Sequence, residues 1–392
     1  MADPPQSPTR HDLAMVDLSN FNLVFQTSTD VSGSNWNAPV VPGVWADYPS
    51  LAVAQNGRLV MGFNQTDGIN VYGFQSEVST NGGGTWSGPY TVTSGSNTAT
   101  FGRVVASGNT FYYIYADTSA QPTYVLRCLQ SGDGMSWSGC TPNATLNTYT
   151  KPAAVSKYGF CVNPPTCSQT PVIYYAPNID ASSAPGLGWV VVYPVARVDN
   201  PTINNIKFCA QNLGGCATIT WGADLFLQGI STSGNGDLWI SAHTYANGTG
   251  YDLPLRLLAV YRRADGSYLS GFLQGANGIP GIDPTSWFIF PPPPKCDNHP
   301  CLFAGDYMRF GMNAYTAATL PFVQRDSSYR TGLMQNFVQD PATGLPPVNG
   351  LQIGPVEPFG SISTSSIPLS QAELQRRPVD THASIHYLRG GH

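Results

Sequence analysis

The sequence predicts an all-β protein, and three observations support this class. Tyr, Phe and Trp make up 11% of the 392 residues, and the chain contains 41 glycines and 33 prolines. Aromatic residues favour pleated, half-buried strands, whereas Gly and Pro favour turns. No apolar i, i+3, i+4, i+7 pattern extends beyond three turns, and only residues 369–377 are predicted to form a short helix. All-β folds often reach this length as one domain.

Charge and hydropathy exclude several classes of function. The formal net charge is −5 and the chain has four lysines, whereas a nucleic-acid-binding surface needs clustered Lys and Arg. No run of eighteen apolar residues exists, so no membrane span is expected. The first twelve residues lack the basic-then-apolar pattern of a signal peptide. We interpret the chain as the mature form of an exported protein, or as one exported by another route.

The cysteines indicate the cellular compartment of the protein. The eight of them fall into four close pairs: Cys128 with Cys140, Cys161 with Cys167, Cys209 with Cys216, and Cys296 with Cys301. Disulfides within each pair are predicted, since the alternative metal site has no C-x-x-C motif and the histidines lie elsewhere. Disulfides persist in oxidising compartments, so an extracellular, periplasmic or cell-surface location is expected.

Three segments repeat at intervals of about fifty residues: 28–36, 79–86 and 131–137. Their serines are 51 and 52 residues apart, and their tryptophans 50 and 51. The second segment, STNGGGTW, matches S-x-D-x-G-x-T-W with Asn for Asp; the other two differ by one insertion and one deletion. Ser and Asp side chains are expected to bond backbone N–H groups in a tight turn, Gly to supply a positive φ, and Trp to pack the hairpin onto its sheet.

This pattern resembles the Asp-box, or BNR repeat, of the sialidase-like β-propellers. The resemblance covers residues 20–390, although its motif is specific only through about residue 140. It implies a propeller whose boxes lie on the rim, far from the ligand site. A propeller blade has one innermost strand, and six segments are candidates: 47–53, 101–106, 151–156, 228–231, 306–311 and 380–385.

Six blades are therefore predicted, with seven as the alternative. The last inner strand has no outer strands after it, and the first Asp-box hairpin has no inner strand before it. The two chain ends are thus expected to share one blade and close the ring. Residues 1–20 are predicted to be an N-terminal extension, and residues 21–390 a single propeller domain.

A propeller's ligand site is expected where the inner strands open onto the central channel. The catalytic candidates there are Asp47, Asp306, Tyr307 and His382. The substrate-binding candidates are Tyr48, Arg103, Lys151, Arg309 and Asp380. Two carboxyl groups can cleave a glycosidic bond, a Tyr or His base suits a lyase, and Arg binds a carboxylate with two hydrogen bonds. These residue types also have purely structural roles as alternatives. The aspartates could bond backbone groups between blades or pair with the arginines. The tyrosines could pack between blades, and the histidine could serve only to close the ring.

The resemblance to catalytic sialidases implies an arginine triad, an aspartic acid as acid/base, and a tyrosine nucleophile activated by a glutamate. It also implies an F/Y-R-I-P motif, but the equivalent strand here reads Asp47-Tyr-Pro-Ser, without arginine. The chain has only three glutamates, Glu77, Glu357 and Glu373, and Glu77 is expected to face the rim. Sialidase activity in the strict sense is therefore not predicted.

The predicted function is that of a secreted carbohydrate-active protein that cleaves glycosidic bonds of an anionic or complex glycan. The alternative is a non-catalytic propeller that binds glycans, as a lectin or adhesin does, or binds proteins. No cofactor is expected. A structural Ca²⁺ is compatible with the fold, but no EF-hand-like Asp spacing indicates one.

Overall fold

The structure is a computed structural model. It describes residues 10–17, 20, 22–29, 36–67, 71–94, 102–120, 122–152, 172–174, 179–184, 186–201, 203–213 and 216–219, and beyond these only the strands β17 to β26, mostly without side chains. The chain divides into two compact units. One contains residues 1–151, 179–192 and 208–217, and the other contains residues 152–178, 193–207 and 218–392.

The N-terminal sheet pairs β1 (His11–Asp17) with β2 (Asn22–Ser28) in antiparallel register. The edge of β2 that does not face β1 pairs with the segment before β3. The N–H of Leu23 donates to the carbonyl of Val44. The predicted N-terminal extension, residues 1–20, therefore contains a strand of its own.

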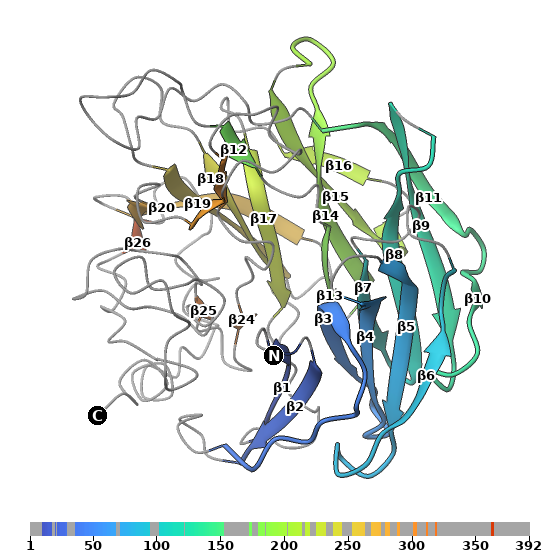
Figure 1. Cartoon of the computed structure of the whole chain (residues 1–392). Helices are drawn as coiled ribbons and strands as arrows, with labels where there is room; N and C mark the ends of the chain where they lie inside the picture. The colour runs from blue at the N-terminus through green and yellow to red at the C-terminus, as the bar shows by residue number, and fades with distance from the viewer. Residues whose placement is uncertain are drawn as a thin grey trace. The chain divides into compact units, whose positions relative to one another are not determined.

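Three sheets share one order, in which consecutive strands are neighbours (Figure 1). The first consists of β3 (Ala46–Val53), β4 (Leu59–Thr66), β5 (Val71–Ser79) and β6 (Ser87–Thr91). The second consists of β7 (Arg103–Ser107), β8 (Thr110–Asp117), β9 (Thr123–Ser131) and β10 (Ser138–Gly139), with β11 (Thr145–Thr150) also on β9. The third consists of β13 (Asp180–Ala184), β14 (Gly188–Ala196), β15 (Asn204–Ala210) and β16 (Cys216–Ile219), with a 3-10 turn, η1 (Gln211–Leu213), before β16. Four consecutive antiparallel strands are the construction of a propeller blade.

A fourth sheet repeats this order with β17 (Leu225–Thr232), β18 (Leu238–Thr244), β19 (Leu253–Arg262) and β20 (Tyr268–Gly275). Two short strands extend it: β21 (Ile279–Ile282) on β19 and β26 (Ile362–Ser363) on β20. The remaining strands are β12 (Val172–Tyr174), β22 (Phe288–Phe290), β23 (Cys301–Phe303), β24 (Gly311–Met312) and β25 (Ala318–Thr319). The all-β class is confirmed for the described residues. Among them no helical segment has the length and apolar character that a membrane crossing requires.

The strand sequences explain these sheets. β8 reads TFYYIYAD, and every residue after Thr110 is buried, because both faces of its sheet are covered. β-branched and aromatic residues suit such a position. β6 reads SGPYT and is largely exposed, which suits an outer edge where Pro89 need not donate a ladder hydrogen bond.

Two apolar clusters show that successive sheets stack face to face. The first joins Val16, Leu23 and Phe25 of β1–β2 to Leu59, Met61 and Phe63 of β4. The second joins Val60, Phe74 and Val78 to Val104, Phe111 and Tyr113 of the next sheet, with the Phe74 and Tyr113 rings stacked at 3.9 Å. Alternate residues of β4 therefore belong to opposite clusters, as strand geometry requires.

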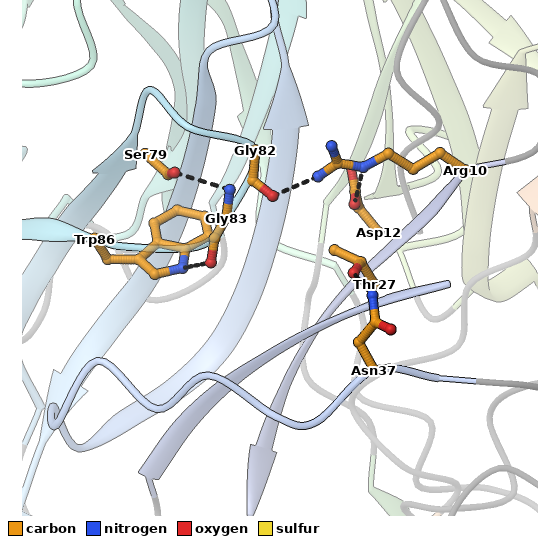
Figure 2. Close-up of polar contacts among 8 residues, drawn as sticks. All are labelled: Arg10, Asp12, Thr27, Asn37, Ser79, Gly82, Gly83 and Trp86. Carbon is orange, nitrogen blue, oxygen red and sulfur yellow. Dashed lines mark hydrogen bonds and ion pairs between the residues drawn. The ribbon is translucent and has the colours of Figure 1, made fainter. Parts of the chain in front are cut away.

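The second repeated segment forms the expected turn (Figure 2). The Ser79 hydroxyl accepts the N–H of Gly83 at 2.9 Å, and the Asn81 side chain accepts the N–H of Thr85 at 3.0 Å. The Trp86 indole donates to the Gly83 carbonyl at 3.1 Å. Gly83 has φ of 88°, which a residue with a Cβ rarely adopts. The predicted turn chemistry is confirmed here.

The third segment repeats these contacts. The Ser131 hydroxyl accepts the N–H of Gly134 at 2.8 Å, and the Asp133 carboxylate accepts the N–H of Ser136 at 2.9 Å. The latter hydrogen bond is the largest cause of the lowered pKa of Asp133. The Trp137 indole donates to the Gly134 carbonyl at 3.1 Å. Residues 30–35 of the first segment lie outside the described residues.

Each turn also docks onto the preceding sheet, which was not predicted. Trp86 meets Phe25 of β2 edge-on at 4.9 Å, and Arg10 donates to the carbonyl of Gly82 at 2.6 Å (Figure 2). In the next turn the Trp137 indole reaches the Ser76 hydroxyl of β5 at 3.3 Å. The repeated turns therefore join one sheet to the sheet before it.

Two of the four predicted disulfides are confirmed. Cys128 is bonded to Cys140 and Cys209 to Cys216, with Cα–Cα distances of 5.4 and 4.2 Å. The first ties β9 to the residue after β10, and the second ties β15 to β16. The pairs Cys161–Cys167 and Cys296–Cys301 lie outside the described residues, apart from the backbone of Cys301 in β23.

Candidate functional site

The candidate site is built on the first strands of neighbouring sheets. β3 contacts β7, and β7 contacts β13. The predicted inner strands 47–53, 101–106 and 228–231 overlap β3, β7 and β17, each of which begins a sheet. The candidates at the starts of β3 and β7 are therefore brought to adjacent strands.

Lys151 lies at the end of the second sheet, and its role in substrate binding stays a prediction. This residue directly follows β11, an outer strand of the second sheet; its side chain is exposed and its N–H donates to the carbonyl of Pro122 at 2.8 Å. The strand next to β7 is instead β13, Asp180–Ala184. Its sequence, DASSA, lacks the apolar residues by which the other first strands could be found.

Asp47 and Tyr48 lie at a distortion of β3. Asp47 pairs with Asn64, and the next pair is Ser50 with Gly62, so β3 carries one extra residue, a β-bulge. Tyr48 has φ of 52° and a 5% exposed side chain. Its N–H donates to the Asp47 carboxylate at 2.9 Å. A bulky residue at positive φ is uncommon and stores strain of about 1–3 kcal/mol, and such residues cluster at functional sites.

The position of this bulge relative to β7 is fixed by a side chain. The Ser50 hydroxyl accepts the N–H of Val104 at 3.0 Å, which ties β3 to β7 just after Arg103. Asp47 shares the face of its partner Asn64, and this is the face that carries Val60 of the second apolar cluster. Asp47 therefore lies on the side of its sheet that faces β7.

Arg103 forms a buried ion pair that was not predicted. Its Nε lies 3.5 Å from an oxygen of Asp180 on β13, and the two side chains are only 3% and 6% exposed. The guanidinium also donates to the carbonyl of Gly102 at 3.0 Å. The structural alternative, in which Arg103 pairs with an aspartate on a neighbouring strand, therefore holds, with Asp180 in place of the aspartates considered.

The other predicted site residues lie outside the described residues: Asp306, Tyr307, Arg309, Asp380 and His382. Within the described part of the chain, no group of three or more His, Cys, Asp or Glu side chains could hold a metal ion.

Glu77 is buried in the first sheet, beside the turn at residues 79–86. Its side chain on β5 is 2% exposed, and it pairs across the sheet with Met61 of the first apolar cluster. The carboxyl group lies against Gly88, where a Cβ would stand 3.1 Å from Oε2. Burial raises the pKa of Glu77 to about 7. Sequence alone did not reveal this, because the neighbouring Ser87 and Gly88 belong to a strand that covers Glu77 only after folding.

Glu77 is expected to make the protein less stable as pH rises. Its pKa is about 4.5 in the unfolded chain and about 7 in the folded one, so its contribution is complete below pH 4.5 and is lost as pH rises through 7. At pH 8 the loss is about 3 kcal/mol, since each pKa unit is worth about 1.4 kcal/mol. Urea unfolding of Glu77→Gln should therefore show a higher midpoint than wild type at pH 8 and a similar one at pH 4.5. Parallel pH profiles for the two proteins would contradict this assignment.

Comparisons with known proteins show only remote similarity. No family model matches the chain, and no curated protein matches it. Among solved structures, an α-L-arabinanase of Penicillium chrysogenum complexed with arabinobiose aligns with TM-score 0.40 and 13% identity over 61% of this chain and 69% of that one. An α-L-arabinofuranosidase of Fusarium graminearum aligns with TM-score 0.37 and 12% identity, over 62% and 70%. The NanB sialidase of Streptococcus pneumoniae aligns with TM-score 0.36 and 12% identity, over 58% of this chain and 33% of that one. At TM-scores below 0.5, none of these similarities assigns an activity to this chain.

Proposed function

We propose that this protein is an exported, glycan-acting β-propeller that cleaves glycosidic bonds where its inner strands begin. The bulge at Asp47 and Tyr48 carries the proposal. Bulges and strained residues occur next to active sites, where they re-aim a side chain. Here the strained Tyr48 donates its N–H to Asp47, so the distortion directly orients a carboxylate.

The proposed fold is a propeller of six blades, in which the two chain ends together complete one blade. The four sheets of consecutive strands and the face-to-face stacking of the first sheets support it. The two confirmed disulfides support an oxidising, extracellular or periplasmic location.

The proposed chemistry assigns Asp47 one of the two carboxyl roles in glycoside cleavage. Glycoside cleavage needs a second carboxyl group, and the predicted candidates for it, Asp306 and Asp380, lie outside the described residues. Arg103 is reassigned from substrate binding to positioning, since its guanidinium is occupied by Asp180. A lyase reaction through Tyr307 or His382 would need no second carboxylate.

The test is a panel of soluble polysaccharides, read for reducing ends and for unsaturated products, with wild type and Asp47→Asn. An asparagine carbonyl can still accept the Tyr48 N–H, so the variant should fold normally. Removal of the charge should lower turnover by about 100-fold or more. The matched control is Asp199→Asn, at an exposed aspartate paired with Arg197. Turnover unchanged in Asp47→Asn would exclude Asp47 from the reaction.

A non-catalytic glycan-binding function is the second candidate. It is favoured by the half-exposed aromatic side chains of Trp45 and Tyr72, since sugars stack on such rings. Retention on immobilised polysaccharide without any product would support binding over cleavage.

A further inference from the structure

The loop between β10 and β11 contains an asparagine in the sequence context of N-linked glycosylation. The acceptor pattern is Asn-x-Ser/Thr, in which x is any residue except proline. The chain has this pattern at Asn64, Asn143 and Asn247. Such a short motif also occurs by chance, and an acceptor is expected in a surface loop, so the surroundings of each asparagine decide. Asn247 lies outside the described residues.

Burial excludes Asn64 as a glycan carrier in the folded protein. Asn64 lies in β4, between its partners Asp47 on β3 and Phe74 on β5, and its side chain is 0% exposed. Apolar clusters cover both faces of β4, and the threonine of the motif, Thr66, is buried too. An oligosaccharide on the Asn64 amide would therefore have no path to solvent.

Asn143 has the opposite surroundings. It lies between β10 and β11, which both pair with β9 at the outer side of the second sheet. Among the described strands, no further strand pairs with β10 or β11. Residues 141–145 are all exposed. A large group attached here would displace no strand of the described sheet.

Contacts with β9 hold the backbone on both sides of this asparagine. The disulfide joins Cys140, before it, to Cys128 of β9, and the N–H of Cys128 donates to the carbonyl of Ala144 at 2.8 Å. The guanidinium of Arg127 donates to the Thr145 hydroxyl at 3.3 Å. The loop is thus held through the residues that flank the asparagine, which leaves its amide available for modification.

We propose that Asn143 is an N-glycosylation site that accepts an oligosaccharide through its first N-acetylglucosamine. A bond forms between Nδ2 of Asn143 and C1 of this sugar, and the bond from C1 to the pyrophosphate of a lipid-linked oligosaccharide donor breaks. The amide loses one proton, and the lipid pyrophosphate leaves. The proposal rests on the exported location in the proposed function, since N-glycans are found on secreted proteins, but not on glycoside cleavage.

Folding selects between the two described motifs. Transfer to the unfolded chain would find both asparagines accessible. A chain modified at Asn64 could not bury this side chain between β3 and β5, so it would fail to fold and would be retained in the cell. A chain modified at Asn143 keeps every described strand pair. The secreted protein should therefore carry its glycan at Asn143 and not at Asn64.

The experiment is expression of the full chain behind a cleavable export signal in a eukaryotic host. Site-resolved mass spectrometry before and after treatment with a peptide-N-glycosidase measures the occupancy of each asparagine, and it keeps any signal at Asn247 apart. The secreted chain is expected to carry a glycan at Asn143 in most molecules and none at Asn64.

Variants of the motif provide matched controls. Thr145→Ala should abolish the modification of Asn143, because the third position of the motif must be Ser or Thr. Thr145→Ser should preserve it. Asn143→Gln should abolish it as well while leaving the contact of Thr145 with Arg127 in place, which separates loss of the motif from loss of that contact.

The outcomes separate this site from the proposed glycan-acting function. An unmodified Asn143 in both the secreted and the retained chain would overturn the site, even if the protein cleaves a polysaccharide. A glycan at Asn64 in the secreted chain would overturn it too, because burial would then not discriminate between the motifs. A secreted chain that carries its glycan at Asn143 but neither binds nor cleaves any polysaccharide would confirm the site and refute the proposed function.

Discussion

Replacement of Gly83 by alanine is expected to lower the free energy of unfolding by about 2–5 kcal/mol. Gly83 has φ of 88°, and alanine in a left-handed conformation costs about 1–2 kcal/mol. A Cβ at this position would also overlap the ring of Phe25 on β2, and overpacking adds about 1–3 kcal/mol. The measurement is urea unfolding followed by tryptophan fluorescence.

Gly57→Ala is the matched control for Gly83→Ala. Gly57 has a similar φ of 80°, but no atom lies within 4 Å of the position of its Cβ. This variant should lose only the conformational part, about 1–2 kcal/mol. Equal losses at the two positions would mean that the turn does not dock tightly onto β2. A Phe25→Leu replacement should partly rescue Gly83→Ala, which a double-mutant cycle would detect.

Replacement of Arg103 by methionine is expected to destabilise the protein by about 3–5 kcal/mol. The change removes the guanidinium from the buried carboxylate of Asp180, and a buried charge that has lost its ion-pair partner is costly. The double variant Arg103→Met with Asp180→Asn should recover part of the loss, since no charge remains to be buried. Denaturant unfolding of Arg103→Met, Asp180→Asn, the double variant and wild type gives the coupling energy.

The control for Arg103 is an exposed ion pair of the same type. The Nη2 atom of Arg197 lies 2.5 Å from Oδ2 of Asp199, but the Asp199 side chain is 68% exposed. Water screens such a pair, so Arg197→Met should leave the midpoint unchanged. If Arg103→Met also left the midpoint unchanged, the pair with Asp180 would not contribute to holding β7 against β13.

Local chemistry was predicted well from the sequence. The turn at residues 79–86 follows from a few adjacent side chains that bond their own backbone, and the structure has these bonds. Two close cysteine pairs were predicted for a similar reason, because a short loop leaves few other partners. β3, β7 and β17 were found from short strand patterns next to turn residues.

Contacts between distant segments were not predicted. Arg103 and Asp180 are separated by a long stretch of chain, and nothing near residue 180 resembles the other first strands. Lys151 was assigned to an inner strand because the first two intervals of about fifty residues were assumed to continue. The chain inserts residues between β11 and β13 instead, and spacing alone cannot reveal where such an insertion begins.

The sequence determined the all-β class, the turn chemistry and the polar residues at the start of β3, because each depends on residues a few positions apart. Only the tertiary structure decided which face each strand buries and which charges meet. It placed Glu77 against Gly88 and paired Arg103 with Asp180. These features arise from pairing between strands and stacking of sheets, and the free energies of such contacts depend on neighbours that no local pattern encodes.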